Sequence, residues 1–142
     1  MGWILFLLYA AGLVYFLFLS EDYGRHAGTG QLRYNLMPLR EIRRFIRYAD
    51  TVGYRAAMLN LTGNIAGFCP FGAILPVLRR SMRSFWKMVL LCALISTTIE
   101  VIQMITRVGV CDVDDIILNT LGGAAGYGIF AICNHFRRKW YG

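Results

Sequence analysis

Four long apolar stretches, separated by polar segments, dominate the pattern along the chain. They cover residues 2–19, 56–78, 85–105 and 116–133. The first, GWILFLLYAAGLVYFLFL, carries no charge, and a helix of that length, rising ~1.5 Å per residue, nearly crosses a hydrocarbon core of ~30 Å. A signal peptide is the alternative, but no Lys or Arg precedes Gly2 and FLFLSEDYG is a poor cleavage site. The pattern therefore predicts four transmembrane helices.

The polar connection after the first apolar stretch contains a different pattern. In LREIRRFIRYA, apolar residues recur at helical spacing and arginines fill the other faces. The apolar positions are Leu39, Ile42, Phe45, Ile46 and Ala49, and the basic ones are Arg40, Arg43, Arg44 and Arg47. This pattern predicts an amphipathic helix over about residues 38–49 that lies in the headgroup region of an anionic membrane. A helix that caps the bundle is a compatible alternative.

Composition supports the membrane class. Hydrophobic residues make up 57% of the 142 positions and charged residues only 16%, whereas soluble domains are nearer half apolar and a quarter charged. A net charge of +7 suits either nucleic acid or anionic lipid as a partner. The apolar stretches favour anionic lipid. We therefore expect an all-α integral membrane protein with one domain, residues 1–142: a compact bundle of four transmembrane helices with an amphipathic interfacial helix between helices 1 and 2. No nucleic-acid partner is expected.

The cysteines do not indicate a disulfide or a metal site. Cys69, Cys92, Cys111 and Cys133 are scattered without a CxxC pair, and the chain has two histidines. Most of the cysteines fall in apolar runs, where the side chain behaves as a small hydrophobe. We expect no bound metal ion and no cofactor.

Basic residues give a weak signal for orientation. The segment between the first two stretches holds seven Lys or Arg, the 79–87 turn holds four and the C-terminus three. Because these segments alternate between the two sides, a plain count is balanced. Weighting the tight RRSMRSFWK turn and the FRRKW tail favours cytoplasmic termini and an external CDVDD loop.

Polar residues interrupt the last three apolar stretches at helical spacing. They are Asn60 and Asn64 in the second, Ser96, Glu100 and Gln103 in the third, and Asn119 in the fourth; Arg107 continues the spacing just after the third stretch, and Asp112 and Asp115 just before the fourth. An ionised side chain at membrane depth costs of order 2.5–3.5 kcal/mol, so these groups should face the bundle interior or water. We therefore expect a polar cavity between the second, third and fourth helices.

Structural roles are the alternative for most of these residues. Asparagines in membrane helices often only link helices, at ~0.6 kcal/mol on average. Gly63xxxGly67 and Gly122xxxGly126 would let backbones approach closely, and Asp114 and Asp115 would cap a helix N-terminus. Glu100 is harder to explain in this way. Burial would have to keep it neutral, or Arg107, roughly 10 Å away along the helix, would have to reach it.

Four motifs, in order along the chain, resemble those of the VanZ-like family. They are LRYNLMPLREI (residues 32–42), LNLTGNIAGFCPFGAILP (59–76), STTIEVIQ (96–103) and CDVDDIILNTLGGAAGY (111–127). They are similar to the family patterns RxNLxPF, NxxGNxxxFxPxG, SxxIExxQ and DxDDxxxNTxGG. Leu39 replaces a Phe of that pattern, and Cys111 stands where an aromatic residue is common.

The resemblance implies a small multi-helix membrane protein, some of whose relatives lower susceptibility to teicoplanin-type lipoglycopeptides. It implies no settled mechanism. Carried over position by position, it marks as binding candidates Arg33, Asn35, Pro38, Asn60, Asn64, Glu100, Gln103, Asp112, Asp114, Asp115 and Asn119. A catalytic residue is unknown, with Glu100 and Asp115 as candidates.

Three functions are compatible with these residues. The first is binding of an amphiphile: a membrane lipid, a lipoglycopeptide antibiotic or a lipid-linked cell-wall precursor, with its anionic part near Arg33 and the arginines of residues 40–47. The second is a membrane enzyme acting on a lipid-linked phosphate, with Glu100 as acid or base and the Asp112, Asp114 and Asp115 carboxylates holding a divalent cation. The third is a structural protein whose glycine-rich helices dock other membrane proteins.

Overall fold

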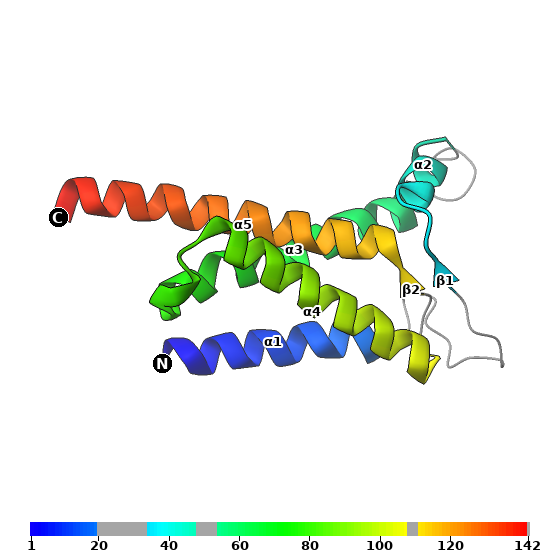
Figure 1. Ribbon diagram of the computed structural model, residues 1–142, viewed down its shortest axis with the longest axis horizontal. Helices are drawn as coiled ribbons and strands as arrows, with labels where there is room; N and C mark the ends of the chain where they lie inside the picture. The colour runs from blue at the N-terminus through cyan, green and yellow to red at the C-terminus, as the bar shows by residue number, and fades with distance from the viewer. Residues whose placement is uncertain (20–33, 48–53, 108–110, 142) are drawn as a thin grey trace.

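The protein is a bundle of long helices with a short strand pair at one end (Figure 1). The computed structural model describes residues 1–19, 34–47, 54–107 and 111–141. In chain order the elements are α1 (Gly2–Leu19), β1 (Tyr34–Asn35), α2 (Arg40–Arg47), α3 (Tyr54–Leu78), the 3-10 turn η2 (Arg80–Met82), α4 (Phe85–Thr106), β2 (Cys111–Asp112) and α5 (Val113–Tyr141). Both termini lie at the η2 end, whereas α2, β1 and β2 lie at the other, which we call the strand end.

Three helices are long and apolar enough to cross a membrane by length and composition. These are Leu61–Leu78 within α3, Phe85–Thr106 and Val113–Trp140 within α5. The stretch Gly2–Phe18 of α1 is apolar but shorter. The expectation of a predominantly helical protein with several apolar spans is therefore confirmed, whereas a crossing by α1 and a position of α2 in the headgroups remain predictions.

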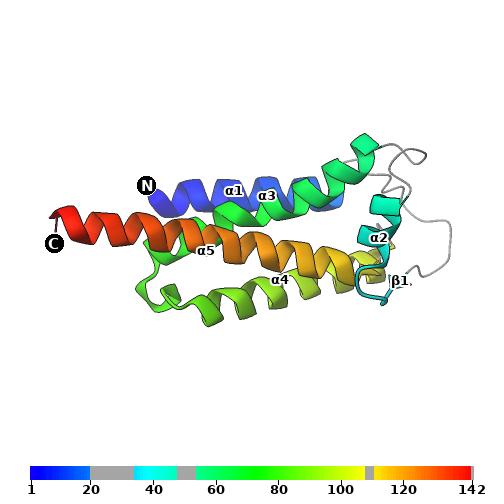
Figure 2. The same ribbon diagram turned by 90° about the horizontal axis from the view of Figure 1, so that it is seen from above.

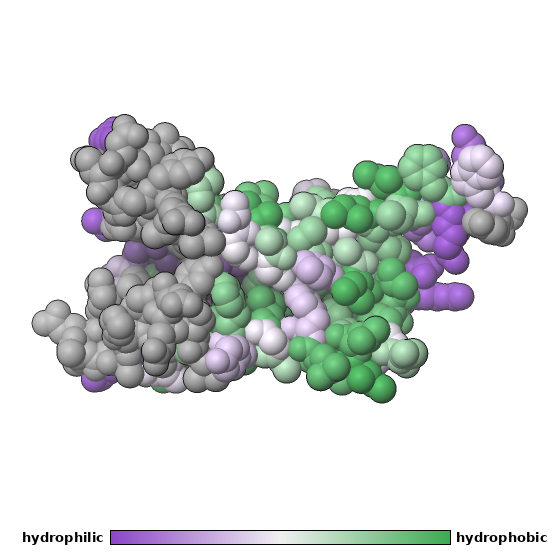
Figure 3. Space-filling view, turned by 180° about the vertical axis from the view of Figure 1, so that it is seen from behind, coloured by the Kyte–Doolittle hydropathy of each residue, from purple (hydrophilic) through white to green (hydrophobic). Residues whose placement is uncertain are grey.

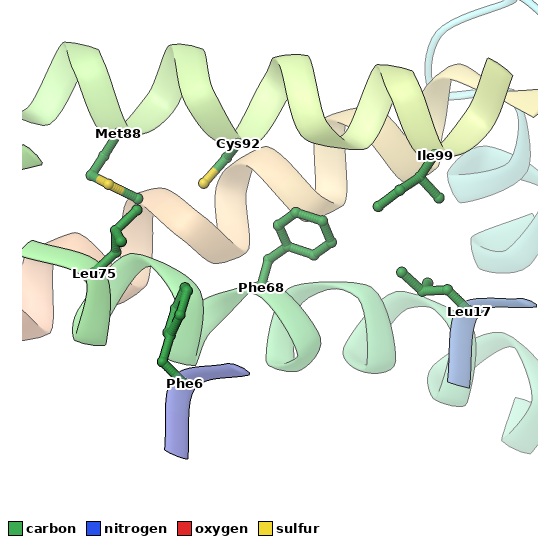
Figure 4. Packing of buried hydrophobic residues seen from close by; sticks show 7 residues of the cluster. All are labelled: Phe6, Leu17, Phe68, Leu75, Met88, Cys92 and Ile99. Atoms are coloured by element: carbon green, nitrogen blue, oxygen red, sulfur yellow. The ribbon is translucent and has the colours of Figure 1, made fainter. Parts of the chain in front are cut away.

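The apolar core lies between α1, α3 and α4. Figure 4 shows side chains from these three helices pointing toward one another. The buried members of this cluster are Phe6, Leu17, Phe68, Leu75, Met88, Cys92 and Ile99. Because the outer faces of the same helices carry many exposed apolar residues, the bundle has apolar side chains both inside and outside, as expected for a protein surrounded by lipid.

Small residues bring α3 and α5 into backbone contact. A Cβ added at Gly122 would lie 2.3 Å from the carbonyl oxygen of Ile65, and one at Gly126 would lie 1.9 Å from that of Cys69. From the other side, a Cβ at Gly72 would lie 2.0 Å from the carbonyl oxygen of Gly123. The predicted close approach at Gly122xxxGly126 is confirmed. Since α5 also packs on α4 (Figure 2), it links two of the other long helices.

Two helices have boundaries that differ from those that hydrophobicity predicts. The last helix runs from Val113 to Tyr141 instead of 116–133, because polar and basic residues continue a helix even where the apolar run has ended. The amphipathic helix begins at Arg40, not at Pro38, and is described as far as Arg47; residues 48 and 49 lie outside the described part.

Candidate functional site

Two short strands join segments far apart in the sequence at the start of α5. β1 and β2 pair in parallel, with Tyr34 opposite Cys111 and Asn35 opposite Asp112. Within the second pair, Asn35 Nδ2 donates to Asp112 Oδ1 at 3.1 Å. We call Asp112, Asp114 and Asp115 the acidic cluster. The strand pair therefore places the polar side chain of Asn35 directly against the first member of this cluster.

Asp112 caps the N-terminus of α5. Its Oδ1 also accepts a hydrogen bond from the backbone N–H of Asp114 at 2.9 Å, which is the side-chain-to-N2 contact of an N-cap residue. The sequence predicts Asp114 and Asp115 as alternative caps. That expectation is wrong for this helix, because the chain enters α5 one turn earlier than hydrophobicity predicts and thereby frees both aspartates for other partners.

Asp114 instead holds the start of α2. Its Oδ1 accepts from the backbone N–H of Leu39 at 2.5 Å, and its Oδ2 accepts from that of Ile42 at 3.2 Å. The first N–H groups of a helix have no partner within the helix, and a carboxylate there also meets the positive end of the helix dipole. A single carboxylate, 1% exposed, thus fixes α2 on α5 across more than seventy residues of sequence.

Glu100 supports the same arrangement from α4. It lies six residues before Thr106, roughly 9 Å from that end of the helix, and its side chain is 3% exposed. Its Oε2 accepts from the backbone N–H of Asp112 at 2.8 Å. This contact helps to explain why a carboxylate is tolerated in an apolar helix. Glu100 accepts a hydrogen bond from a buried N–H group, which would be unfavourable if it were left without an acceptor. Arg107 is exposed and forms no ion pair with Glu100 in the described structure.

Polar pairs link α5 to α3 and α4 at two successive levels. Asn64 Nδ2 donates to Asp115 Oδ1 at 2.6 Å. One turn further along α5, Asn119 Nδ2 donates to Ser96 Oγ at 2.8 Å. The Oδ1 atom of Asn119 is buried and accepts no hydrogen bond from the residues that the structure describes. The predicted inward orientation of these side chains is confirmed, and they form hydrogen bonds across the helix interfaces.

Gln103 has a separate role from the acidic cluster. Its side chain is buried, and Nε2 donates to the backbone carbonyl of Leu17 at 2.9 Å. Because this carbonyl belongs to the last turn of α1, its partner within the helix would be missing in any case. Gln103 therefore ties the end of α1 to α4.

We call the hydrogen-bonded polar residues around Asp112, Asp114 and Asp115 the acidic network. The other candidates lie at the edge of this network or outside the described residues. Pro38 is exposed in the turn that leads into α2. Arg33 lies outside the described part of the chain, and the same holds for the side chain of Asn60. Their grouping with the other residues remains a prediction.

The three aspartates of the cluster do not converge on one point. Asp112 contacts Asn35, Asp114 contacts the start of α2, and Asp115 contacts Asn64. Among the described residues, no group of three His, Cys, Asp or Glu side chains is placed to hold a metal ion. The hypothesis of a divalent cation held jointly by Asp112, Asp114 and Asp115 is therefore wrong for this arrangement.

Cys111 is a buried member of the site that sequence reasoning passed over. Burial raises the pKa of its thiol above the ordinary value, and the negative charges of Glu100 and Asp112 add to this shift. The thiol is thus held in its neutral form beside the carboxylates. Because Cys111 directly precedes Asp112 in the sequence, its closeness to the aspartates can be predicted from the sequence alone. Its pairing with Tyr34 cannot, because that pairing requires the long-range strand contact.

The network presents one surface to the outside, formed by β1, the following turn and α2. We call residues 34–47 the surface segment. Its exposed apolar side chains are Tyr34, Leu36, Met37 and Leu39, and its exposed basic ones are Arg40, Arg43 and Arg47. Leu39 has φ 63°, a left-handed conformation that costs a non-glycine residue of order 1–2 kcal/mol. The contact of its N–H with Asp114 helps to hold that conformation.

Comparison with known proteins places the chain in a family. The sequence profile of the VanZ/LLP1 family matches residues 6–134. The chain belongs to the VanZ/LLP1 family. Protein VanZ of Enterococcus faecium is 35% identical over 77 residues, which are 54% of this chain and 47% of that protein. The matched region thus spans about half the length of this relative. No solved structure matches the chain significantly.

Family membership and the three candidate spans together describe a VanZ-like, multi-pass membrane protein. The profile covers every residue of the network, from Asn35 to Asn119, so this polar arrangement lies within the family domain. The match does not by itself assign a ligand to it.

Proposed function

We propose that this chain binds the polar part of an amphiphile at the surface of the bacterial cytoplasmic membrane and thereby alters susceptibility to lipoglycopeptide antibiotics of the teicoplanin type. The amphiphile is a phospholipid, a lipid-linked cell-wall precursor or the antibiotic itself. Membership of the VanZ/LLP1 family and similarity to Protein VanZ support the link to resistance. The surface segment supports the binding step.

In this proposal four helices cross the bilayer, α1 included. The outer face of α1 carries exposed apolar residues along its length, among them Ile4, Leu8, Val14 and Tyr15. Exposed apolar side chains in such number are costly in water but favourable against lipid. A helix of eighteen residues spans about 27 Å, which suffices if the bilayer adapts slightly or residues at its ends reach the interface.

One observation carries the proposal: the carboxylate of Asp114 holds the N-terminus of α2 so that apolar and basic side chains of the surface segment stay exposed together. Leu36 and Met37 suit the acyl region just below the headgroups. Arg40, Arg43 and Arg47 suit phosphate or carboxylate groups above them. This combination matches an amphiphile better than it matches a purely polar or purely apolar ligand.

The buried residues act as positioning groups in this scheme. Glu100 holds the N–H of Asp112, Asp112 holds Asn35, and Asp114 holds α2. Each interaction fixes one part of the surface segment relative to α4 and α5. Binding is favoured over catalysis because the described carboxylates already accept hydrogen bonds that maintain this arrangement.

Antibiotic susceptibility and lipid retention test the proposal. The full chain is expressed in a susceptible host, and the minimal inhibitory concentration of teicoplanin is measured with equal membrane abundance checked by immunoblot. We expect the Arg40→Gln/Arg43→Gln double variant to lose most of the protective effect, because each cation near an anionic surface contributes roughly 1 kcal/mol. Glu100→Gln and Asn64→Ala should weaken it as well, by loosening the scaffold.

Lys139→Gln is the control for loss of charge elsewhere, since Lys139 belongs to the last turn of α5 and the C-terminus lies at the opposite end of the bundle from α2. It should leave both teicoplanin susceptibility and the lipids that co-purify with the chain unchanged. The proposal fails if Glu100→Gln and Asn64→Ala alter neither readout. It also fails if the arginine double variant behaves like Lys139→Gln.

A further inference from the structure

A second candidate site lies at the η2 end, away from the acidic network. A cleft of about 350 Å³ opens between the segment after η2 and the C-terminal part of α5. It is lined mainly by Arg83, Tyr127, Phe130, Asn134, His135 and Arg138. We propose that this cleft binds the phosphate-bearing headgroup of an anionic phospholipid.

Arg83 is held in place for such a contact. Its Nε donates to the backbone carbonyl of Pro76 at 3.0 Å, and its guanidinium carbon lies 5.8 Å from the centre of the Phe130 ring. The Nε bond and the ring fix the plane of the guanidinium group. Within the described structure, the two terminal nitrogens make no hydrogen bond, so they are available to an anionic oxygen.

α5 supplies the remaining polar groups from a single face. Asn134, His135 and Arg138 follow Tyr127 and Phe130 at spacings that place them along one side of a helix. Asn134 Oδ1 accepts from Arg137 at 3.3 Å, which leaves its amide N–H groups as donors. The cleft thus presents guanidinium, amide and imidazole groups together, and this donor set suits a phosphate.

The surroundings favour an anion at this position. Residues 79–87 and 134–141 contain Arg79, Arg80, Arg83, Lys87, Arg137, Arg138 and Lys139, and neither stretch contains an Asp or a Glu. In Figure 3 hydrophilic residues gather at this end, beside the hydrophobic middle of the bundle. A cluster of cations at the end of a membrane bundle attracts acidic lipids, as basic pockets between membrane helices do.

A lipid explains the cleft better than a free anion. Its inner wall is aromatic, with Tyr127 and Phe130, and the exposed ring of Phe85 lies beside Tyr127, with 5.8 Å between the ring centroids. Trp86 and Trp140, each 75% exposed, belong to the same end, and tryptophans prefer the headgroup level. A headgroup in the cleft would therefore leave its acyl chains beside an apolar surface.

Native mass spectrometry of the full chain in detergent tests this assignment. Dioleoyl-phosphatidylglycerol, dioleoyl-phosphatidylcholine and inorganic phosphate are titrated separately. We expect the first lipid adduct to form at clearly lower concentrations of phosphatidylglycerol than of phosphatidylcholine. Arg138→Gln should weaken the first phosphatidylglycerol adduct roughly fivefold, as expected for one interfacial cation, and Arg83→Gln should weaken it at least as much.

Lys139→Gln is the matched control, because it removes the same charge one residue away without lining the cleft. It should change affinity less than twofold. Equal losses of phosphatidylglycerol affinity in Arg138→Gln and Lys139→Gln would mean that the lipid is attracted by the overall charge of this end. That result would overturn the cleft as the binding site. Equal affinity for both lipids would overturn the preference for an anionic headgroup. Displacement of phosphatidylglycerol by equimolar inorganic phosphate would overturn the assignment of a lipid as the ligand. Since Arg138 is exposed, its variant reports on binding even if Arg83→Gln does not fold.

Discussion

Asp114 places a buried carboxylate between two helices whose sequences lie far apart. Both of its oxygens accept backbone N–H groups at the start of α2. With these bonds in place, the short helix stays docked on α5 although its described part is only eight residues long, a length at which isolated helices are unstable in water. The stability of α2 therefore depends on a residue that is not part of it.

Replacing Asp114 should release α2 selectively. Asp114→Ala leaves two partly buried N–H groups without this acceptor, at a cost near the lower end of the roughly 1–3 kcal/mol that a buried group would incur. We expect trypsin to cleave the variant at Arg40, Arg43 or Arg47 several times faster than the unmodified chain in detergent, with the sites identified by mass spectrometry. Asp114→Asn, which keeps one acceptor oxygen, should show a smaller increase. Unchanged cleavage in Asp114→Ala would contradict the capping role.

At the scale of elements, the contact between α3 and α5 depends on residues without side chains. The carbonyl of Cys69 occupies the space where a Cβ at position 126 would lie. Such a contact cannot relax through a side-chain rotation, because the obstructing atom belongs to the backbone. The two helices would have to separate to admit even a methyl group.

Gly126→Ala should therefore destabilise the bundle, whereas Gly128→Ala should not. Overpacking typically costs 1–3 kcal/mol, so the variant at position 126 should unfold at a clearly lower temperature in detergent, measured by circular dichroism. A Cβ at Gly128 would meet no atom within 4 Å, and alanine favours a helix by about 1 kcal/mol over glycine. Equal melting temperatures for both variants would show that the backbones are not in firm contact.

Helix positions followed from the sequence more readily than contacts between elements. The apolar runs predicted α3 and α4 to within two residues at each end, since hydrophobicity and helix limits coincide there. The polar spacing also predicted that Asn64, Glu100 and Asn119 face inward. What local patterns did not contain was the pairing of Tyr34–Asn35 with Cys111–Asp112. That two-residue ladder brings residues together over more than seventy positions, and it decides which aspartate caps which helix.

For the whole molecule, the acidic network lies at one end of the bundle, whereas basic residues lie at both ends. The acidic network and α2 lie at the strand end, and the termini, η2 and the basic cleft lie at the other. Lys and Arg concentrate on the cytoplasmic side of bacterial membrane proteins. Although the arginines of the surface segment weaken a simple count, the short basic turn and tail favour the η2 end as the cytoplasmic one.

Cysteine labelling in cells would establish this arrangement together with the crossing by α1. A membrane-impermeant maleimide should modify Arg107→Cys in intact cells, but Arg80→Cys and Lys139→Cys only after permeabilisation, with the unmodified chain giving the background from its own four cysteines. An epitope added before Met1 should be protected in intact cells, like Lys139→Cys, because four crossings return the chain to its starting side. If the epitope is accessible while Lys139→Cys is protected, α1 does not cross. If Lys139→Cys is labelled and Arg107→Cys is not, the surface segment faces the cytoplasm and cannot meet an antibiotic outside the cell.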